Sequence, residues 1–305
     1  MTFSEGRRRA PERILIYGSF GTGKSFCWVD IAQTHYEAGQ LDRTMYAIDT
    51  DYGWPKMADE GYGHLEDDGM LVTYHPVDFP ELMAASKEIS KRAGPGDWVV
   101  IDMLSYAWVE AQSYYINNVY GDEPEDYWTT MRAEVVEKGG HDPRSYGGHE
   151  GTDWGYITKI YKQFELPLTM KTQAHVLAIT EERKLDENRG DEGAKIKQFK
   201  PANKMAPVGQ KGIGHRFDTI FRMTQRASGG RMLTMVKDRG REGTNKAWDR
   251  DDGRSLTIHE PPKAFATSYL VRVAGWSSPS QPKSAKKKSK GKGKKKSQPT
   301  TRRRH

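Results

Sequence analysis

Short, continuous apolar runs recur between residues 13 and 236, and the first three lead into glycine or acidic residues. A strand that is covered on both faces of a parallel sheet has this pattern, because neither of its sides meets water. These runs therefore predict buried strands, and the intervening segments with helical composition predict helices. The predicted strands cover residues 13–17, 45–49, 98–101, 175–179, 217–221 and 232–236.

Two intervening segments carry clear helix signals. Residues 24–38 are predicted to form a helix that ends near Gly39, a residue type favoured just after a helix C-terminus. Residues 81–93 are helical by composition and stop at the Gly-Pro-Gly cluster of residues 94–96. Strands that alternate with helices predict an α/β fold with a doubly wound, mainly parallel sheet and helices on both faces.

Four stretches depart from this alternation. Residues 110–152 form an insertion rich in aromatic and charged residues, whose rings either stack nucleic-acid bases or belong to a core or interface. Residues 182–214 show little periodicity and predict a long loop. We expect residues 1–11 to be a flexible basic arm and residues 276–305, rich in Lys, Ser, Gly and Pro, to be a disordered tail. Residues 12–275 are then the folded domain.

Positive charge is concentrated in the tail. Residues 276–305 contain nine Lys, three Arg and no acid, a charge of +12, whereas the whole chain carries +7, so residues 1–275 carry −5. Such a tail binds polyanions such as DNA without sequence selectivity. The alternative is a solubilising tail or a localisation signal.

Cysteine content and hydropathy narrow the class of protein further. The single Cys27 excludes an intramolecular disulfide and a cysteine-based zinc cluster. No apolar run reaches 18 residues, so we expect no membrane-spanning helix and no membrane partner. These features predict a cytoplasmic protein, located in the host cytoplasm if a phage encodes the chain.

The most specific motif follows the first predicted strand. Residues 18–25 read GSFGTGKS, which is a complete G-x-x-x-x-G-K-[ST] phosphate loop between a strand and a helix. Backbone N–H groups of such a loop bind phosphates, the lysine reaches the β- and γ-phosphates, and the hydroxyl binds Mg²⁺. The predicted phosphate-binding residues are Gly18, Ser19, Phe20, Gly21, Thr22, Gly23, Lys24, Ser25 and Phe26.

Carboxylates follow two other predicted strands. Asp102 ends the run of residues 98–101, the pattern of an acid that holds Mg²⁺ together with Ser25, although Asp is also a good helix N-cap. Asp51 follows the run of residues 45–49, and Thr180 follows the run of residues 175–179. Because carboxyl ends of parallel strands share one edge, we expect these groups to converge with Lys24.

Two cations follow the last predicted strand. Lys237 and Arg239 alternate along an extended segment, so their side chains lie on the same side of it. They either reach an anion on a neighbouring subunit or belong to a solvated charged turn.

Together these residues resemble the RecA-type ATPases, in the single-domain form found among phage recombination proteins of the Sak type. The similarity spans roughly residues 12–245. Its ordered motifs are GSFGTGKS at 18–25, AIDTD at 47–51, WVVID at 98–102, VLAITEER at 176–183, APVGQKG at 206–212, RFDTIFRM at 216–223 and VKDR at 236–239.

The resemblance implies ATP and Mg²⁺ as cofactors and a homo-oligomer, either ring or filament. It implies that Lys237 and Arg239 reach the γ-phosphate of the neighbouring subunit and that Thr180 acts as a polar sensor. Asp51 stands where the family usually has a glutamate as catalytic base, so its shorter side chain implies slower hydrolysis unless the loop compensates.

The resemblance also implies that residues 182–214 contact DNA. The lysines of this stretch favour that role, and its acids, Glu187, Asp191 and Glu192, oppose it. The lysines are Lys195, Lys197, Lys200, Lys204 and Lys211.

The leading hypothesis is a Mg²⁺-dependent ATPase that acts on DNA, most naturally single-stranded, in phage recombination or strand annealing. Lys24, Asp51, Asp102, Thr180, Lys237 and Arg239 are its predicted catalytic residues. One alternative is a replicative-type helicase or another DNA motor. Another is a DNA-binding protein that uses ATP only as a structural ligand.

Overall fold

A computed structural model describes residues 10–121, 150–186, 192–227, 230–239, 255–258 and 265–271, together with residues 130, 137 and 188. The predicted tail and almost all of the predicted arm lie outside the described residues, so their disorder stays a prediction. The strands are β1 (Arg13–Tyr17), β2 (Met45–Asp49), β3 (Leu71–Tyr74), β4 (Trp98–Asp102), β5 (His175–Thr180), β6 (Glu182–Lys184), β7 (Met205–Pro207), β8 (Thr219–Gln225), β9 (Arg231–Asp238) and β10 (Ser255–Ile258). The helices are α1 (Phe26–Glu37), α2 (Trp54–Met57), α3 (His64–Asp67), α4 (Phe79–Arg92), α5 (Leu104–Tyr120), α7 (Glu150–Thr169) and α8 (Gly193–Gln198), with helical turns η1 (Ala58–Tyr62), η4 (Lys200–Ala202), η5 (Ile213–His215) and η6 (Ala266–Val271).

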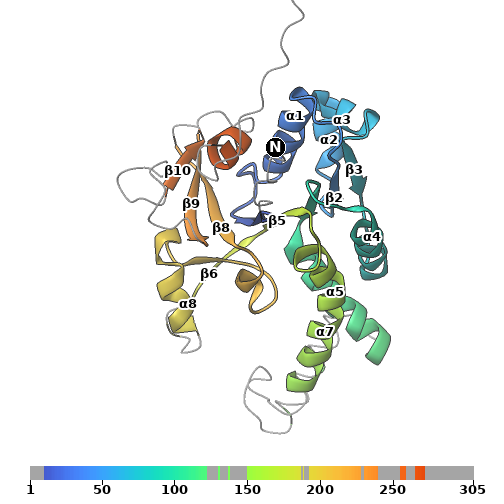
Figure 1. The fold of residues 1–305 in the computed structure, drawn as a ribbon. Helices are drawn as coiled ribbons and strands as arrows, with labels where there is room; N and C mark the ends of the chain where they lie inside the picture. Colours follow the sequence, from blue (N-terminus) through green and yellow to red (C-terminus); the bar gives the residue numbers. More distant parts are fainter. Residues whose placement is uncertain are drawn as a thin grey trace, which may run out of the picture.

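Eight strands form one central sheet in the order β10-β9-β8-β1-β5-β4-β2-β3 (Figure 1). The strands from β8 to β3 in this order are parallel, whereas β9 runs antiparallel to β8 and β10 antiparallel to β9. The prediction of a mainly parallel α/β sheet is therefore confirmed. The carboxyl ends of β1, β2, β4 and β5 lie at a common edge.

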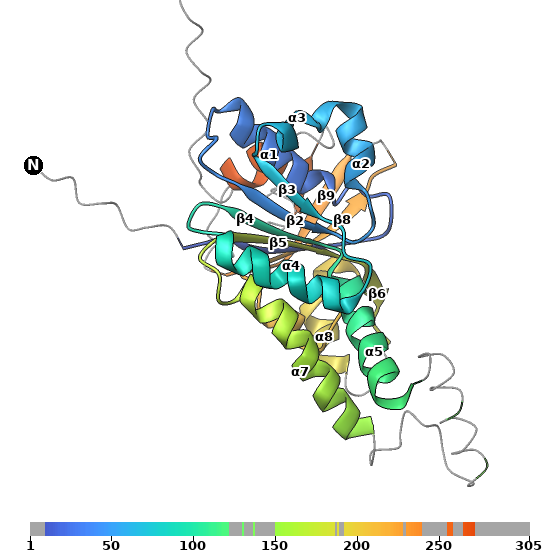
Figure 2. The ribbon, with the colours of Figure 1, turned by 90° about the vertical axis from the view of Figure 1, so that its right-hand side faces the viewer.

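Helices cover both faces of the sheet, as predicted (Figure 2). Ile14 and Ile16 point into a core with α1, α2, α3 and η6, and Leu15 and Tyr17 point into a second core with α4, α5 and α7. This double burial explains why β1 is a continuous apolar run, since both sets of alternating side chains leave water.

The boundaries of most predicted elements agree with the structure. The helix predicted for residues 24–38 is α1, which is followed by Gly39 with φ of +69°. The strand predicted for residues 217–221 is shifted toward the C-terminus, because β8 begins at Thr219. The half-buried strand β3 was not predicted.

The two irregular stretches contain more structure than the sequence predicted. Helix α5 extends through Tyr120 and α7 begins at Glu150, so the ends of the 110–152 insertion are helical. Within this insertion Tyr115 is largely buried, which fits the core alternative for that ring, whereas Tyr114 packs against Phe79 but stays 37% exposed.

The long loop predicted for residues 182–214 is wrong. Here β6 and β7 pair antiparallel and enclose α8 and η4. Phe199 and Ala202 pack into the second core, which explains how a segment without clear periodicity becomes ordered. Within the described residues, no helix is long and apolar enough to span a membrane.

Candidate functional site

The GSFGTGKS segment joins the end of β1 to the start of α1, as the motif predicts. A Cβ at Gly18 would overlap the carbonyl oxygen of Met223, so the loop crosses β8 at a distance that only glycine permits. Gly21 and Gly23 have φ of +68° and +85°, in the left-handed region that favours glycine. The glycines therefore fix a tight loop whose last turn leads into the N-terminus of α1.

Lys24 is buried within this loop. Its Nζ donates hydrogen bonds to the carbonyl oxygens of Gly18 at 3.0 Å and Ser19 at 2.8 Å. Burial lowers the pKa of Lys24, and the charge of Asp102 acts in the opposite direction. The ammonium group is thus held at the mouth of the loop by carbonyl oxygens that a phosphate oxygen could replace.

Three carboxylates gather beside the loop. One oxygen each of Asp49, Asp51 and Asp102 lies within 4.8 Å of the other two. Asp49 and Asp102 end the neighbouring strands β2 and β4, in register with each other, and Asp51 follows two residues later. The convergence that the sequence predicted for Asp51 and Asp102 is therefore present, and Asp49 joins them.

Asp102 is fully buried and only partly satisfied. Its Oδ2 accepts a hydrogen bond from the indole N–H of Trp28 at 3.0 Å, while its buried Oδ1 has no hydrogen-bond partner. The N-cap of α5 is Met103, without a side-chain cap, so the alternative role of Asp102 as a helix cap is wrong. A buried carboxylate oxygen without a donor is suited to a cation.

Burial and neighbouring negative charge raise the pKa values of Asp102 and Asp49. Burial, followed by the charge of Asp51, raises the pKa of Asp102 to about 7, against the hydrogen bond from Trp28 and the neighbouring Ser25 hydroxyl, which lower it. Burial, followed by interaction with Asp51, raises the pKa of Asp49 to about 6. A bound cation would relieve the repulsion among clustered carboxylates. Oxygen ligands in this number suit Mg²⁺, so the residues present fit that ion.

The carboxylates of Asp49 and Asp51 differ in how firmly the surrounding backbone holds them. Asp49 accepts hydrogen bonds from the backbone N–H groups of Gly53 at 3.2 Å and Trp54 at 2.9 Å, which fix its carboxylate at the start of α2. Asp51 is exposed and lines the cavity described next. The more mobile acid is therefore the one that faces the open space.

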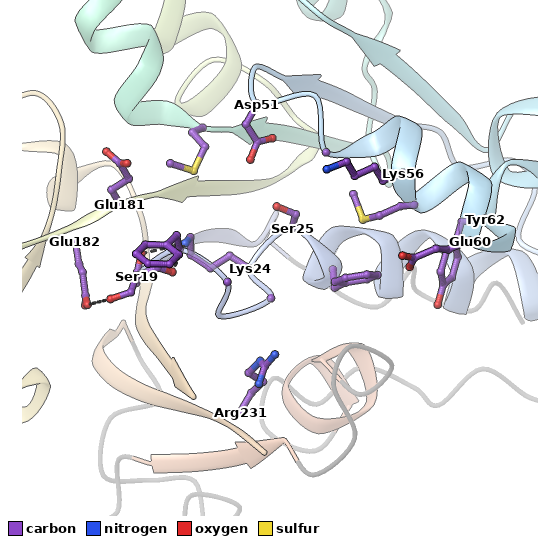
Figure 3. Close-up of a pocket in the computed structure, with 18 residues that line it drawn as sticks. Ser19, Lys24, Ser25, Asp51, Lys56, Glu60, Tyr62, Glu181, Glu182 and Arg231 are labelled. Atoms are coloured by element: carbon purple, nitrogen blue, oxygen red, sulfur yellow. Dashed lines mark hydrogen bonds between the residues drawn. The ribbon is translucent and has the colours of Figure 1, made fainter. Parts of the chain in front are cut away.

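A cavity of about 1090 Å³ opens over the phosphate loop (Figure 3). Its walls come from the loop, from α2 and η1, from the end of β5 and from the start of β9. Outside the loop and Phe26, the lining residues are Asp51, Gly53, Lys56, Met57, Glu60, Tyr62, Met103, Glu181, Glu182 and Arg231. This volume is at the large end of the range for small-molecule sites.

Thr180 does not face this cavity. It is fully buried at the end of β5, and its hydroxyl donates a hydrogen bond to the carbonyl oxygen of Val208 at 2.8 Å. The next two residues, Glu181 and Glu182, line the cavity instead. The predicted sensor role of Thr180 is not tested by this geometry, which shows only that its hydroxyl is engaged with the backbone.

Lys237 and Arg239 lie at the opposite edge of the sheet from the phosphate loop. Because β9 is antiparallel to β8, Asp238 pairs with Thr219 at the start of β8, whereas the loop follows the far end of β1. Lys237 donates to the carbonyl oxygens of Gly214, at 2.9 Å, and Phe217. Arg239 is 65% exposed and pairs with Asp218 at 3.2 Å. The structure does not bring these cations to the loop of their own subunit.

The same antiparallel pairing brings Arg231 to the loop. Arg231 opens β9 opposite Gln225, the last residue of β8, and lines the cavity beside Gly23. Sequence reasoning missed it, because the direction of β9 cannot be read from its composition. Ten residues separate the two predicted strands, and this was the available signal, because a parallel connection needs a crossover of a dozen or more residues.

Glu182 was also missed as a neighbour of the loop. It accepts a hydrogen bond from the Ser19 hydroxyl at 2.6 Å and from Arg222 at 2.7 Å. Arg222 in turn donates to the carbonyl oxygen of Ala202. These contacts connect the phosphate loop with the β6–β7 segment that carries the predicted DNA-contacting lysines.

Of those lysines, Lys197, Lys200 and Lys211 are exposed, and Lys195 and Lys204 are half-buried. The structure does not test whether any of these lysines contacts a polyanion.

Fold and loop together define an α/β protein with a phosphate-loop motif at the carboxyl edge of a mostly parallel sheet. No family model matches the chain, and a search of the curated proteins gives no match either.

Proposed function

We propose that this chain is a Mg²⁺-dependent ATPase of the RecA type that acts on DNA, in phage recombination or single-strand annealing. The observation that carries the proposal is one arrangement at one sheet edge. A GSFGTGKS loop leads from β1 into α1, and three carboxylates within 4.8 Å of one another stand beside it. The loop suits a polyphosphate and the acids suit its metal ion.

In this proposal the loop residues bind the nucleotide phosphates. The backbone N–H groups of the loop would donate to the phosphates, and Lys24 would exchange its two carbonyl partners for β- and γ-phosphate oxygens. Ser25 and Asp102 hold Mg²⁺. When bound, this ion neutralises charge that develops on the phosphates.

Asp51 is the residue proposed to orient the attacking water. It is exposed, it lines the cavity, and it is adjacent to the metal-binding acids. Asp49 is unsuited to this role because two backbone N–H groups already occupy its oxygens.

DNA and a second copy of the chain are the proposed partners. The basic tail of residues 276–305 and the exposed lysines of residues 182–214 supply charge for DNA phosphates. Exposed Arg239 lies far from the loop of its own subunit, which suits a contact with the loop of a neighbouring subunit in a homo-oligomer.

A second candidate function is a DNA-binding protein that uses ATP as a structural ligand without hydrolysing it. The specific observation in its favour is that the Asp51 carboxylate belongs to the acidic cluster itself. A carboxylate that binds the metal is not free to activate water.

ATP turnover with and without single-stranded DNA, at low and high salt, tests the proposal. Lys24→Ala is expected to abolish turnover and to leave DNA binding by the basic tail intact. Undiminished hydrolysis in that variant would contradict the assignment. Nucleotide binding without turnover under any DNA condition would favour the second candidate.

A further inference from the structure

We infer that Arg231 binds the phosphates of a nucleoside triphosphate from within the same subunit, as a second cation beside Lys24. This inference rests on the proposed nucleotide-binding function and adds to it a residue outside the phosphate-loop motif. Arg231 is the first residue of the antiparallel strand β9, and it belongs to none of the sequence motifs described above.

The position of Arg231 carries the first part of the argument. Its Nε lies 3.3 Å from the point where a Cβ on Gly23 would stand, so the guanidinium is next to the loop backbone. Gly23 directly precedes Lys24, and both line the cavity together with Arg231. A side chain at residue 23 would therefore crowd the guanidinium, in addition to the strain that the φ of +85° imposes on any residue other than glycine.

The missing hydrogen bond of Arg231 is the second part of the argument. Its Nε is buried and has no hydrogen-bond partner among the described residues. A guanidinium N–H without an acceptor is costly, and the planar fork of arginine matches phosphate oxygens in pairs. Because Arg231 lines the cavity, an anion bound there would give its guanidinium an acceptor.

The distribution of charge around the loop carries the third part. In the view of Figure 3, Arg231 and Asp51 lie on opposite sides of the loop that holds Lys24. The acids on one side suit a metal ion, and the arginine on the other side suits phosphate oxygens that the metal does not reach. A triphosphate between them would meet positive charge on both sides.

Calorimetric titration of the full chain with ATP and, separately, with inorganic tripolyphosphate tests this inference, in the presence of Mg²⁺. Arg231→Ala is expected to weaken both ligands at least tenfold, and Arg231→Lys to recover part of the loss. Arg226→Ala is the matched control, because Arg226 lies in the same hairpin but is exposed and does not line the cavity. It is expected to bind like the wild type.

Each other outcome is decisive. Wild-type affinity in Arg231→Ala, with loss of binding in Lys24→Ala, overturns the role of Arg231 and leaves the proposed function standing. Weaker ATP with unchanged tripolyphosphate also overturns it, because that result indicates contact with the base or sugar. A wild-type protein that binds neither ligand overturns the proposed function as well. If Arg231→Ala does not fold, judged by circular dichroism, Arg231→Lys and Arg231→Gln decide the question, since only the former keeps the charge.

Discussion

Asp102→Asn should make the metal-free protein more stable at neutral pH while abolishing the Mg²⁺-dependent ATPase activity that we propose for it. Asp102 is fully buried, and its pKa is raised from 3.8 to about 7. The amide has the same shape, and its oxygen still accepts the hydrogen bond from Trp28. The substitution therefore removes the charge without a cavity.

The size of the effect follows from the pKa. Each tenfold change in a protonation equilibrium is worth about 1.36 kcal/mol, so ionising Asp102 in the metal-free native state costs about 4 kcal/mol. Because the native state holds this proton more tightly than the unfolded chain, the free energy of unfolding falls as pH rises from about 4 to about 7. Below that window both states are protonated, and above it the full cost applies.

Thermal unfolding with a chelator between pH 4 and pH 8 measures this cost. The stability advantage of Asp102→Asn over the wild type should grow across this range by about 4 kcal/mol, or about 8 °C in Tm. Asp30 and Glu165 also have raised pKa values, of about 6 and about 7, but they are present in both proteins and largely cancel. Asp78→Asn, at the exposed N-cap of α4, is the control and should follow the wild-type pH dependence.

A constant difference between the two proteins across this pH range would refute the reasoning. It would mean that Asp102 titrates in the native state as it does in the unfolded chain. Addition of Mg²⁺ and ATP at pH 8 gives an independent readout, because it should stabilise the wild type and not Asp102→Asn.

Three further predictions concern Gly18 in the phosphate loop, Asp51 in the acidic cluster and Arg239 at the proposed subunit contact. Gly18→Ala should lower the free energy of unfolding by about 1–3 kcal/mol in denaturant titration, because its Cβ would overlap the carbonyl oxygen of Met223, whereas Gly94→Ala, with no close backbone neighbour, should cost less than about 0.5 kcal/mol. Asp51→Glu should raise kcat in a steady-state ATPase assay about tenfold if residue 51 orients water, and a fall in kcat would instead indicate a metal ligand. Arg239→Ala should lose ATPase activity alone and regain part of it when mixed with Lys24→Ala, because mixed oligomers contain some complete sites; an unchanged rate in Arg239→Ala alone would exclude the trans role.

Periodicity predicted the parallel part of the sheet well for a physical reason. Strands β1, β2, β4 and β5 are buried on both faces, so their sequences are apolar without interruption and leave little choice of structure. Strand β3 is only half-buried, and β6 and β7 are three residues long. None of these three strands therefore produces a long apolar run. Their order comes from pairing partners and from core contacts that are distant in the chain.

The residues of the candidate site also separate into those that local sequence predicts and those that depend on distant strand pairing. The phosphate loop, Asp51 and Asp102 were predictable, because a local motif and the shared edge of parallel strands determine where they lie. Glu182 and Arg231 were not, because each reaches the loop through the position of a strand rather than through a motif.

The direction of β9 decides which end of that strand lies beside the phosphate loop. A parallel β9 would have brought Lys237 and Arg239 toward the carboxyl edge of the sheet, beside Lys24. The antiparallel hairpin instead brings Arg231 there and leaves Arg239 at the other edge, 65% exposed. One strand thus presents cations at both edges, and only an oligomer in which the far edge of one subunit meets the phosphate loop of the next would use both. Loss of activity in Arg231→Ala that mixing with Lys24→Ala does not restore, beside loss in Arg239→Ala that the same mixing restores, is the pattern that this arrangement requires.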